Sequence, residues 1–595
     1  MAVLVCLAAA DGKVVTRNDL FDAVWPGGVV SDDVLTHSIV ELRKAFADSA
    51  RDPEFIETIP KVGFRLISPV SAPNQSSGVE RKASFSWQWP AAAIAALIVT
   101  LIGIVLMLRD VSTDADPVAG TTANRLPSVA VLPFVDMSAA NDHEYFADGL
   151  TEELINRLTQ ISGLQVTGRT SSFYFKNRND DIRTIGEKLS VGHVLAGSIR
   201  RSGDRMRITA QLINVSDGFH AWSKVYDRRA ADIFEIQDEI SESVARALSI
   251  RLSVGAIGAL EGGTTNVEAF EEISRGNAAY LDFDAESVLK AIDHYQNAID
   301  LDPEFGLAWE RLANAYRNAW LVFGRDEYEK WAVVADAAIE QALQIAPTAP
   351  DVLTTAAYMH ADRQEWAAAR RVLERVSELK SSRFVNATMV YSDLLTKTGF
   401  ATDAVDLKER GRIIDPLHSG DALYLAHQYA MLDRIDDALD EVERGWTLGG
   451  YRPQLSMEGM VISLSAGDEG QLRFWLERAI QYTQPGARGI HEAMLGSLGE
   501  PARALRILRD AFAESTATDY FVIVWAGYYG ETELALAAMR RSPDLWAIWL
   551  PIVADARQQP AFIDILQTTG LPDYWREFGW GDFCRPHADA GIVCR

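Results

Sequence analysis

The chain has 595 residues, 48% of them hydrophobic and 24% charged, so it is too long for one core and has the composition of folded domains. Its formal net charge of -26 excludes a protein that wraps nucleic acid over its whole surface, because a polyanion repels phosphates. Residues 1–86 hold 9 Lys and Arg against 11 Asp and Glu, a charge of -2, so the remainder carries -24. Any DNA contact is therefore expected to be local.

The amino-terminal residues predict two helices followed by a hairpin. Thr16 is placed to cap a helix over residues 17–25, and Asp19 completes a carboxylate variant of the capping box. A Pro-Gly-Gly break precedes a second helix over residues 33–47, whose apolar residues recur at helical spacing. Residues 55–68 alternate as two short strands around a tight turn. This order predicts a winged helix-turn-helix over residues 1–70.

This segment resembles the OmpR/PhoB-type winged-helix family, in its membrane-bound ToxR/CadC-like branch. The resemblance rests on DGKVVTRNDLFDAVWPGGVVSDDVLTHSIVELRKAF and IETIPKVGFRL, which cover most of residues 11–66. Members of the family have a small sheet before the first helix, whereas this chain starts inside that helix. We therefore expect either that Met1 lies downstream of the true start or that the domain is truncated.

The resemblance implies that the second helix enters the major groove of promoter DNA and that the hairpin wing contacts the backbone or the minor groove. Arg and Lys neutralise phosphates, and polar groups on a groove face read base edges. The DNA-binding residues expected on this basis are Thr36, His37, Glu41, Arg43, Lys44, Lys61 and Arg65. His37 is equally well explained as a solvated helix residue.

An apolar segment follows. Residues 85–108 carry no charge, and as a helix they approach the roughly 30 Å of a bilayer core. Trp87 and Trp89 lie at one end and Arg109 at the other, as at membrane interfaces. We therefore expect one transmembrane helix over residues 87–109, between linkers at 71–86 and 110–127.

The charges that flank the apolar segment predict its orientation. Arg81 and Lys82 precede it, whereas Arg109 is followed by acidic residues, so the positive flank is the amino-terminal one. The expected location is the inner (cytoplasmic) membrane, single-pass, with a cytoplasmic N-terminus and a periplasmic C-terminal region.

An α/β pattern begins at residue 128. Strands are predicted near 128–134 and 164–169, helices near 182–189 and 232–252, and two further strands between these helices. Another helix, capped by Asp148 or Thr151, is predicted to end near Leu158. The alternation indicates a small mixed-sheet α/β domain. It resembles the TolB amino-terminal or FlgO-like domain, through VAVLPF, FADGLTEEL and HVLAGSIRRSGDRMRITAQLI, and we assign this domain to residues 128–255.

No constellation in this region predicts catalysis. Asp148, Glu152 and Glu153 are more simply explained as acids in a first helical turn. The histidines lack metal-ligand spacing, and the three cysteines match no zinc pattern. We expect no enzyme activity, no catalytic or metal-binding residues and no cofactor.

The carboxy-terminal half predicts helical repeats. Residues 291–319 join two helices through an Asp-Pro turn, the pattern of tetratricopeptide repeats of about 34 residues. We expect about six to eight such repeats in an all-α solenoid over residues 266–570. Its groove suits a protein or peptide partner, and a spacer without a specific ligand is the alternative.

Cys584 and Cys594 lie in a C-terminal tail, residues 571–595. An oxidising compartment favours a short disulfide loop between them, and a cytosolic one favours free thiols.

Taken together, the sequence predicts a multidomain, membrane-anchored DNA-binding transcription regulator, with a homodimer among its expected assemblies because dimerisation doubles DNA contacts. It would couple a periplasmic sensor or interaction region to promoter binding in the cytoplasm. The alternative is a membrane-anchored periplasmic scaffold that binds envelope proteins and carries a non-functional DNA-binding remnant.

Overall fold

The computed structural model divides into two units, residues 1–120 and residues 121–595. In the first unit it describes residues 6–7, 10, 13–16, 19–20, 42, 55–59 and 63–67. In the second it describes residues 126–595 except 140–141, 251–260, 282–283, 324–327, 379–383, 483–484 and 589–590.

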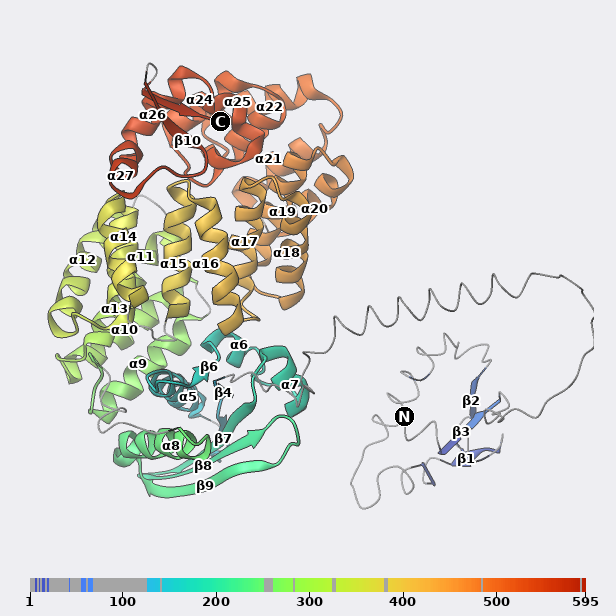
Figure 1. Cartoon of the computed structure of the whole chain (residues 1–595), viewed down its shortest axis with the longest axis vertical. Helices are drawn as coiled ribbons and strands as arrows, with labels where there is room; N and C mark the ends of the chain where they lie inside the picture. Colours follow the sequence, from blue (N-terminus) through green and yellow to red (C-terminus); the bar gives the residue numbers. More distant parts are fainter. Residues whose placement is uncertain are drawn as a thin grey trace, which may run out of the picture. The chain divides into compact units, whose positions relative to one another are not determined.

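The first unit contains a three-stranded antiparallel sheet in the order β1-β3-β2 (Figure 1). Its strands are β1 (Val15–Thr16), β2 (Ile56–Ile59) and β3 (Gly63–Leu66). The predicted hairpin is confirmed, because β2 pairs with β3 from Ile56 opposite Leu66 to Ile59 opposite Gly63. The sheet packs on a small apolar core made of Leu7, Val15, Leu20, Ile56, Phe64 and Leu66.

The predicted transmembrane helix is corrected. Within the described parts of the chain, no helix is both long and apolar enough to cross a membrane. Residues 87–109, where the span was expected, lie outside the described residues. On this finding the expected single-pass inner-membrane location, with its cytoplasmic and periplasmic sides, is withdrawn. The fold class becomes a multidomain chain with a winged-helix-like N-terminal region, an α/β module and a helical solenoid.

The α/β module is built on a mixed sheet with the strand order β6-β4-β7-β8-β9, and β5 pairs with β7. The strands are β4 (Ser128–Val131), β5 (Val135–Asp136), β6 (Gln165–Val166), β7 (His193–Ser202), β8 (Arg205–Asn214) and β9 (His220–Arg229). Strand β4 runs parallel to β6 and β7, whereas β7, β8 and β9 form an antiparallel meander.

Helices cover both faces of this sheet near β4, because a strand buried on both sides needs apolar cover on each. The helices of the module are α5 (Glu144–Thr159), α6 (Arg169–Phe173), α7 (Ile182–Leu189), the 3-10 turn Ala230–Asp232 and α8 (Ile233–Ala247). Val129 and Val131 of β4 pack with α5 and α8, and Ala130 packs with α7 on the opposite face.

Helix α5 starts earlier than predicted. Its N-cap position is His143, so Asp148 and Thr151 lie inside the helix and cap nothing. Thr151 is buried, donates its hydroxyl to the carbonyl of Ala147 and accepts a hydrogen bond from the amide of Phe134. It therefore ties α5 to the segment between β4 and β5.

Successive antiparallel helix pairs follow, from α9 with α10 to α23 with α24, stacked side by side (Figure 1). They are α9 (Val267–Tyr280), α10 (Ala285–Leu301), α11 (Gly306–Phe323), α12 (Tyr328–Ile345), α13 (Pro350–Asp362), α14 (Trp366–Glu378), α15 (Phe384–Lys397), α16 (Ala401–Ile414), α17 (Ser419–Met431), α18 (Ile435–Leu448), α19 (Arg452–Ala466), α20 (Glu469–Tyr482), α21 (Pro485–Leu495), α22 (Pro501–Glu514), α23 (Asp519–Tyr528) and α24 (Thr532–Arg541). The predicted Asp-Pro turn joins α10 to α11 and so connects successive pairs.

Short elements close the chain. They are two 3-10 turns, Ala547–Trp549 and Pro551–Val553, then α25 (Ala554–Arg557), α26 (Pro560–Thr568), α27 (Leu571–Phe578), β10 (Cys584–His587) and β11 (Gly591–Cys594). This segment packs back on earlier helices. The indole of Trp366 on α14 donates a 2.7 Å hydrogen bond to the carbonyl of Thr569, and that of Trp549 donates a 3.0 Å bond to the carbonyl of Lys397.

The α/β module contacts the solenoid at two separate places. Phe146 of α5 meets Phe270 of α9 edge to face, with ring centroids 5.7 Å apart. At the second place, the amide of Ser171 on α6 donates a 2.7 Å hydrogen bond to the buried carboxylate of Asp415, at the end of α16. The Ser171 hydroxyl in turn accepts a hydrogen bond from the amide of Leu417.

Candidate nucleic-acid interface

The structure describes one of the seven expected DNA-binding residues. Arg65 lies on β3, in the wing hairpin. The other expected residues, Thr36, His37, Glu41, Arg43, Lys44 and Lys61, lie outside the described residues. Their role in DNA binding therefore stays a prediction.

The capping box predicted at the first helix is confirmed. The amide of Asp19 donates a 3.2 Å hydrogen bond to the Thr16 hydroxyl, and that hydroxyl donates a 2.7 Å bond to the Asp19 carboxylate. Thr16 also belongs to β1, which pairs with β3. The same two residues therefore start the helix and fix it to the strand that carries Arg65.

Arg65 faces Glu57 across the hairpin. The two residues are direct partners in the β2 to β3 register, and the Arg65 guanidinium forms an ion pair with the Glu57 carboxylate. The Arg65 side chain is 41% exposed, so water screens this pair. Exposed pairs of this kind contribute about 0–1 kcal/mol, and a phosphate group can therefore compete with Glu57 for the guanidinium.

Glu57 was not predicted as a partner of Arg65, although the sequence contained a signal for this pair. In an antiparallel hairpin, directly opposite residues have side chains on the same face. The predicted turn centred on residues 60–63 already placed Glu57 near Arg65. The register observed here makes the two direct partners.

In the second unit, an ionised cluster lies inside the solenoid. The ammonium group of Lys408 on α16 forms an ion pair with Asp421 on α17, and both side chains are almost fully buried. His418 lies 3.0 Å from the same carboxylate oxygen. Burial raises the pKa of Asp421, but the hydrogen bond from His418 and the Lys408 charge outweigh it and bring the pKa down to about 2. Asp421 thus carries its charge in the core.

A cavity of about 190 Å³ lies where the α/β module meets the first repeats. Its apolar wall includes Phe234, Phe270 and Phe305, and Arg157 and Arg311 line it as well. Arg157 is bound to Glu153 and Asp238, and Arg311 is bound to Glu310. These guanidiniums therefore already have acidic partners within the chain.

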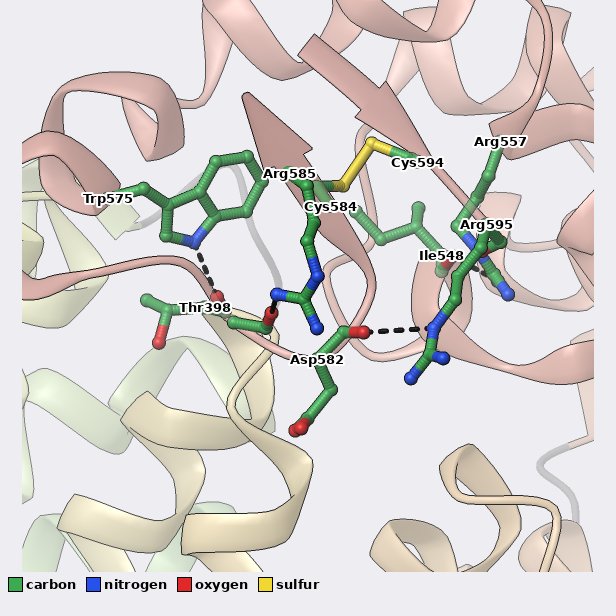
Figure 2. The surroundings of a disulfide bond; sticks show 10 residues. Thr398, Ile548, Arg557, Trp575, Asp582, Cys584, Arg585, Cys594 and Arg595 are labelled. Carbon is green, nitrogen blue, oxygen red and sulfur yellow. Dashed lines mark hydrogen bonds between the residues drawn. A yellow bond between two sulfur atoms is a disulfide. The ribbon is translucent and has the colours of Figure 1, made fainter. Parts of the chain in front are cut away.

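The two predicted disulfide cysteines lie together at the C-terminus. Cys584 on β10 is the direct register partner of Cys594 on β11, and their sulfur atoms are bonded at 2.10 Å (Figure 2). The buried guanidinium of Arg557 donates hydrogen bonds to the carbonyls of Arg595 and Ile548, beside the hairpin. The disulfide thus joins two strands, and the hydrogen bond from Arg557 to Arg595 also holds the end of the second strand in place. Across the described residues, no group of three or more His, Cys, Asp or Glu side chains is arranged to hold a metal ion.

Two protein families match the chain. Residues 1–66 match the transcriptional regulatory protein, C-terminal family, and residues 124–243 match the second domain of HilA/YgeH-like transcriptional regulators. The first match covers the sheet β1-β3-β2, and the second covers most of the α/β module. Over these two segments the chain is similar to transcriptional regulators of the OmpR/PhoB-type and HilA/YgeH-like families.

Curated relatives match this chain over part of its length. The transcriptional activator CadC of Escherichia coli is 40% identical over 13% of the chain and 15% of CadC. The cholera toxin homolog transcriptional activator of Vibrio parahaemolyticus is 42% identical over 14% of the chain and 31% of that protein. A Rhizobium meliloti protein named "Putative adenylate cyclase 3" is 37% identical over 38% of the chain and 37% of that protein. The chain thus spans between 15% and 37% of the length of these relatives.

Solved structures match the chain weakly. A human IFIT1 dimer aligns with 57% of the chain and 80% of its own length at 12% identity, with a TM-score of 0.36. PilF of Pseudomonas aeruginosa aligns with 36% of the chain and 91% of its own length at 14% identity, with a TM-score of 0.29. Scores this low support no inference about fold or function. The helix pairs of this chain are established by its own structure.

Proposed function

We propose that this chain binds double-stranded promoter DNA through residues 1–66 and regulates transcription there. The observation that carries the proposal is the family match over these residues, which coincides with an antiparallel sheet ending in the β2 to β3 hairpin. The residues proposed to contact DNA are Thr36, His37, Glu41, Arg43 and Lys44 on the second helix, with Lys61 and Arg65 on the wing.

The second unit is proposed to control this binding. It carries a domain that matches HilA/YgeH-like regulators, followed by helix pairs of the kind that bind peptide or protein partners. In the proposed mechanism a protein or peptide partner binds the helical repeats and shifts the state of the chain that occupies the promoter. The contacts of Ser171 with Asp415 and Leu417 connect the α/β module to the repeats and support such coupling.

The test is genome-wide crosslinking and immunoprecipitation of the full chain. It is compared with a variant in which Arg43, Lys44, Lys61 and Arg65 are changed to Glu. The matched control carries four charge reversals at exposed cations of the second unit, Lys290, Arg473, Arg503 and Arg576 to Glu. We expect discrete promoter peaks for the wild type and the control, and their loss in the first variant.

Two outcomes contradict the proposal. One is a featureless profile from the wild type, which favours a scaffold with a DNA-binding remnant. The other is a set of peaks that the four reversals in residues 1–66 leave unchanged, which places DNA binding elsewhere in the chain. Footprinting of the recovered promoters with purified protein then separates direct from indirect occupancy.

A further inference from the structure

Strand β9 forms an open edge of the mixed sheet. It is ten residues long and pairs with β8 on one side, and within the described residues no strand pairs with its other side. Its amide and carbonyl groups on that side are therefore available to a further strand. Two apolar residues are exposed there, Val225 on the strand at 55% and Phe219 just before it at 75%.

The side chains of β9 alternate between two different surroundings. Tyr226 is buried against the core that includes α8, and Lys224 and Arg228 reach Glu239 on α8. Val225 and Asp227 point to the opposite face, where Val225 lies beside Thr209. Asp227 on that face binds Arg207 of β8. Even-numbered residues thus face α8, and odd-numbered residues face the open side of the sheet.

Each charge on β9 has a partner in its own chain, which weakens the repulsion between two copies of the strand. Lys224 and Arg228 share Glu239 at 2.8 Å and 2.7 Å, and Arg229 lies 3.5 Å from Asp232. Asp227 is bound by Arg205 and Arg207. Charged edge strands resist pairing, and these internal partners reduce that resistance except where two like charges lie directly opposite each other.

Symmetry limits how two copies of β9 can pair. When a two-fold axis perpendicular to the sheet relates two antiparallel strands, each face of one copy continues as the same face of the other. Even-numbered residues therefore pair with even-numbered residues, and odd-numbered residues with odd-numbered ones. An axis through Lys224 sets two ammonium groups opposite each other. An axis through Tyr226 sets Lys224 opposite Arg228 of the second copy. Both registers place like charges face to face, which destabilises a sheet.

An axis through Val225 avoids these clashes. It sets Val225 opposite Val225 of the second copy, and Trp222 opposite Arg228, a pairing that favours cation–π contact. On the open face it sets Ser223 opposite Asp227, a hydroxyl donor opposite a carboxylate. Of the three registers centred on residues 224, 225 and 226, this one alone opposes no like charges. We propose that the chain forms a homodimer by antiparallel pairing of β9 with β9 of a second copy, centred on Val225.

The decisive test uses charge at the symmetry axis. Val225→Lys places two cations opposite each other, and Val225→Glu places two anions there. Each full-length variant alone is expected to fall from about twice the chain mass of 65.6 kDa to that mass in light scattering. Mixing the two is expected to restore the double mass, since Lys then faces Glu. Val225→Thr keeps a β-branched residue and serves as the matched control that stays dimeric.

A crosslinking experiment tests the register independently of stability. In a Cys6→Ser background, Val225→Cys places two thiols opposite each other, so a mild oxidant should yield a covalent dimer in which two thiols lose two electrons to form one disulfide. Thr209→Cys, one strand inside the edge, should give none. A wild-type chain that is monomeric, or a charge variant that keeps the double mass, overturns the proposal. Because neither measurement involves DNA, this result is independent of the proposed function.

Discussion

The indole of Trp575 donates a 2.9 Å hydrogen bond to the main-chain carbonyl of Thr398, 177 residues earlier in the chain. Trp575 is buried on α27, and Thr398 directly follows α15. Trp549 makes the equivalent bond to Lys397 and stacks on Phe583, just before β10. The C-terminal segment is thus anchored on the middle of the solenoid, so changes at the C-terminus should affect the stability of the whole second unit (Figure 2).

Loss of the terminal disulfide should destabilise this closure. Changing both Cys584 and Cys594 to Ser removes a cross-link between residues separated by 10 positions. A loop of this size contributes about 2–3 kcal/mol by restricting the unfolded chain. We expect a loss of that size in the free energy of unfolding, measured in denaturant under oxidising conditions. With reductant present the wild type should match the double variant, and a persistent difference between them would contradict the account.

Removing the acid opposite Arg65 should strengthen DNA binding. Glu57→Gln keeps the shape of the side chain but frees the Arg65 guanidinium for a phosphate. We expect an affinity gain of about two- to fivefold, corresponding to the range of an exposed ion pair. Fluorescence anisotropy with a promoter fragment measures it. In an Arg65→Gln background the same change should have a clearly smaller effect, and an equal gain there would show that Glu57 acts through general repulsion.

The junction at Gly168 should tolerate no side chain. A Cβ atom at this position would lie 2.6 Å from Cγ of Asp415. We expect Gly168→Ala to cost about 1–3 kcal/mol of unfolding free energy, as overpacking of a tight contact does. Asp415→Gly removes the colliding atoms, so in that background Gly168→Ala should cost much less. Gly192→Ala is the matched control, because its nearest neighbour would be 3.8 Å away. Additive losses in the double variant would contradict a direct collision.

The buried ring of His491 should make the second unit sensitive to mild acid. Burial lowers the pKa of His491 to about 4, and its Nδ1 atom has no hydrogen-bond partner among the described residues. The folded state therefore keeps the His491 ring neutral. The contribution of this group to the free energy of unfolding is fully present above about pH 6.5, the ordinary pKa of histidine. That contribution is lost as pH falls from about 6.5 toward 4, by about 1.4 kcal/mol per pH unit. Denaturation curves between pH 7 and 4 measure this slope, and His491→Leu should flatten it. An unchanged slope in that variant would assign the sensitivity to other groups.

Local signals in the sequence determined many of the elements. Helix α7 was predicted at residues 182–189 and is observed there, because Asp181 caps it through the amides of Arg183 and Thr184. The wing hairpin followed from alternating residues around a tight turn, and the first capping box followed from Thr16 and Asp19. Capping and alternation act over a few residues, so one sequence is sufficient to show them.

Other features depended on partners distant in the chain. Strand β9 was not predicted from the sequence, because an edge strand buries few side chains and has only a weak alternation of apolar residues. Helix α5 was predicted to start too late, because Thr151 accepts a hydrogen bond from the amide of Phe134 instead of capping the helix. The apolar segment predicted a membrane span, yet none of the described helices is long and apolar enough for one.

The sequence by itself determined the order of the modules, the wing hairpin and the helical character of the second half, because each is encoded by neighbouring residues. Only the tertiary structure decided that Asp415 meets Ser171 and that Trp575 reaches Thr398. Both contacts join residues more than 170 positions apart. Such pairings arise when whole helices and strands pack against one another, and no local propensity specifies them.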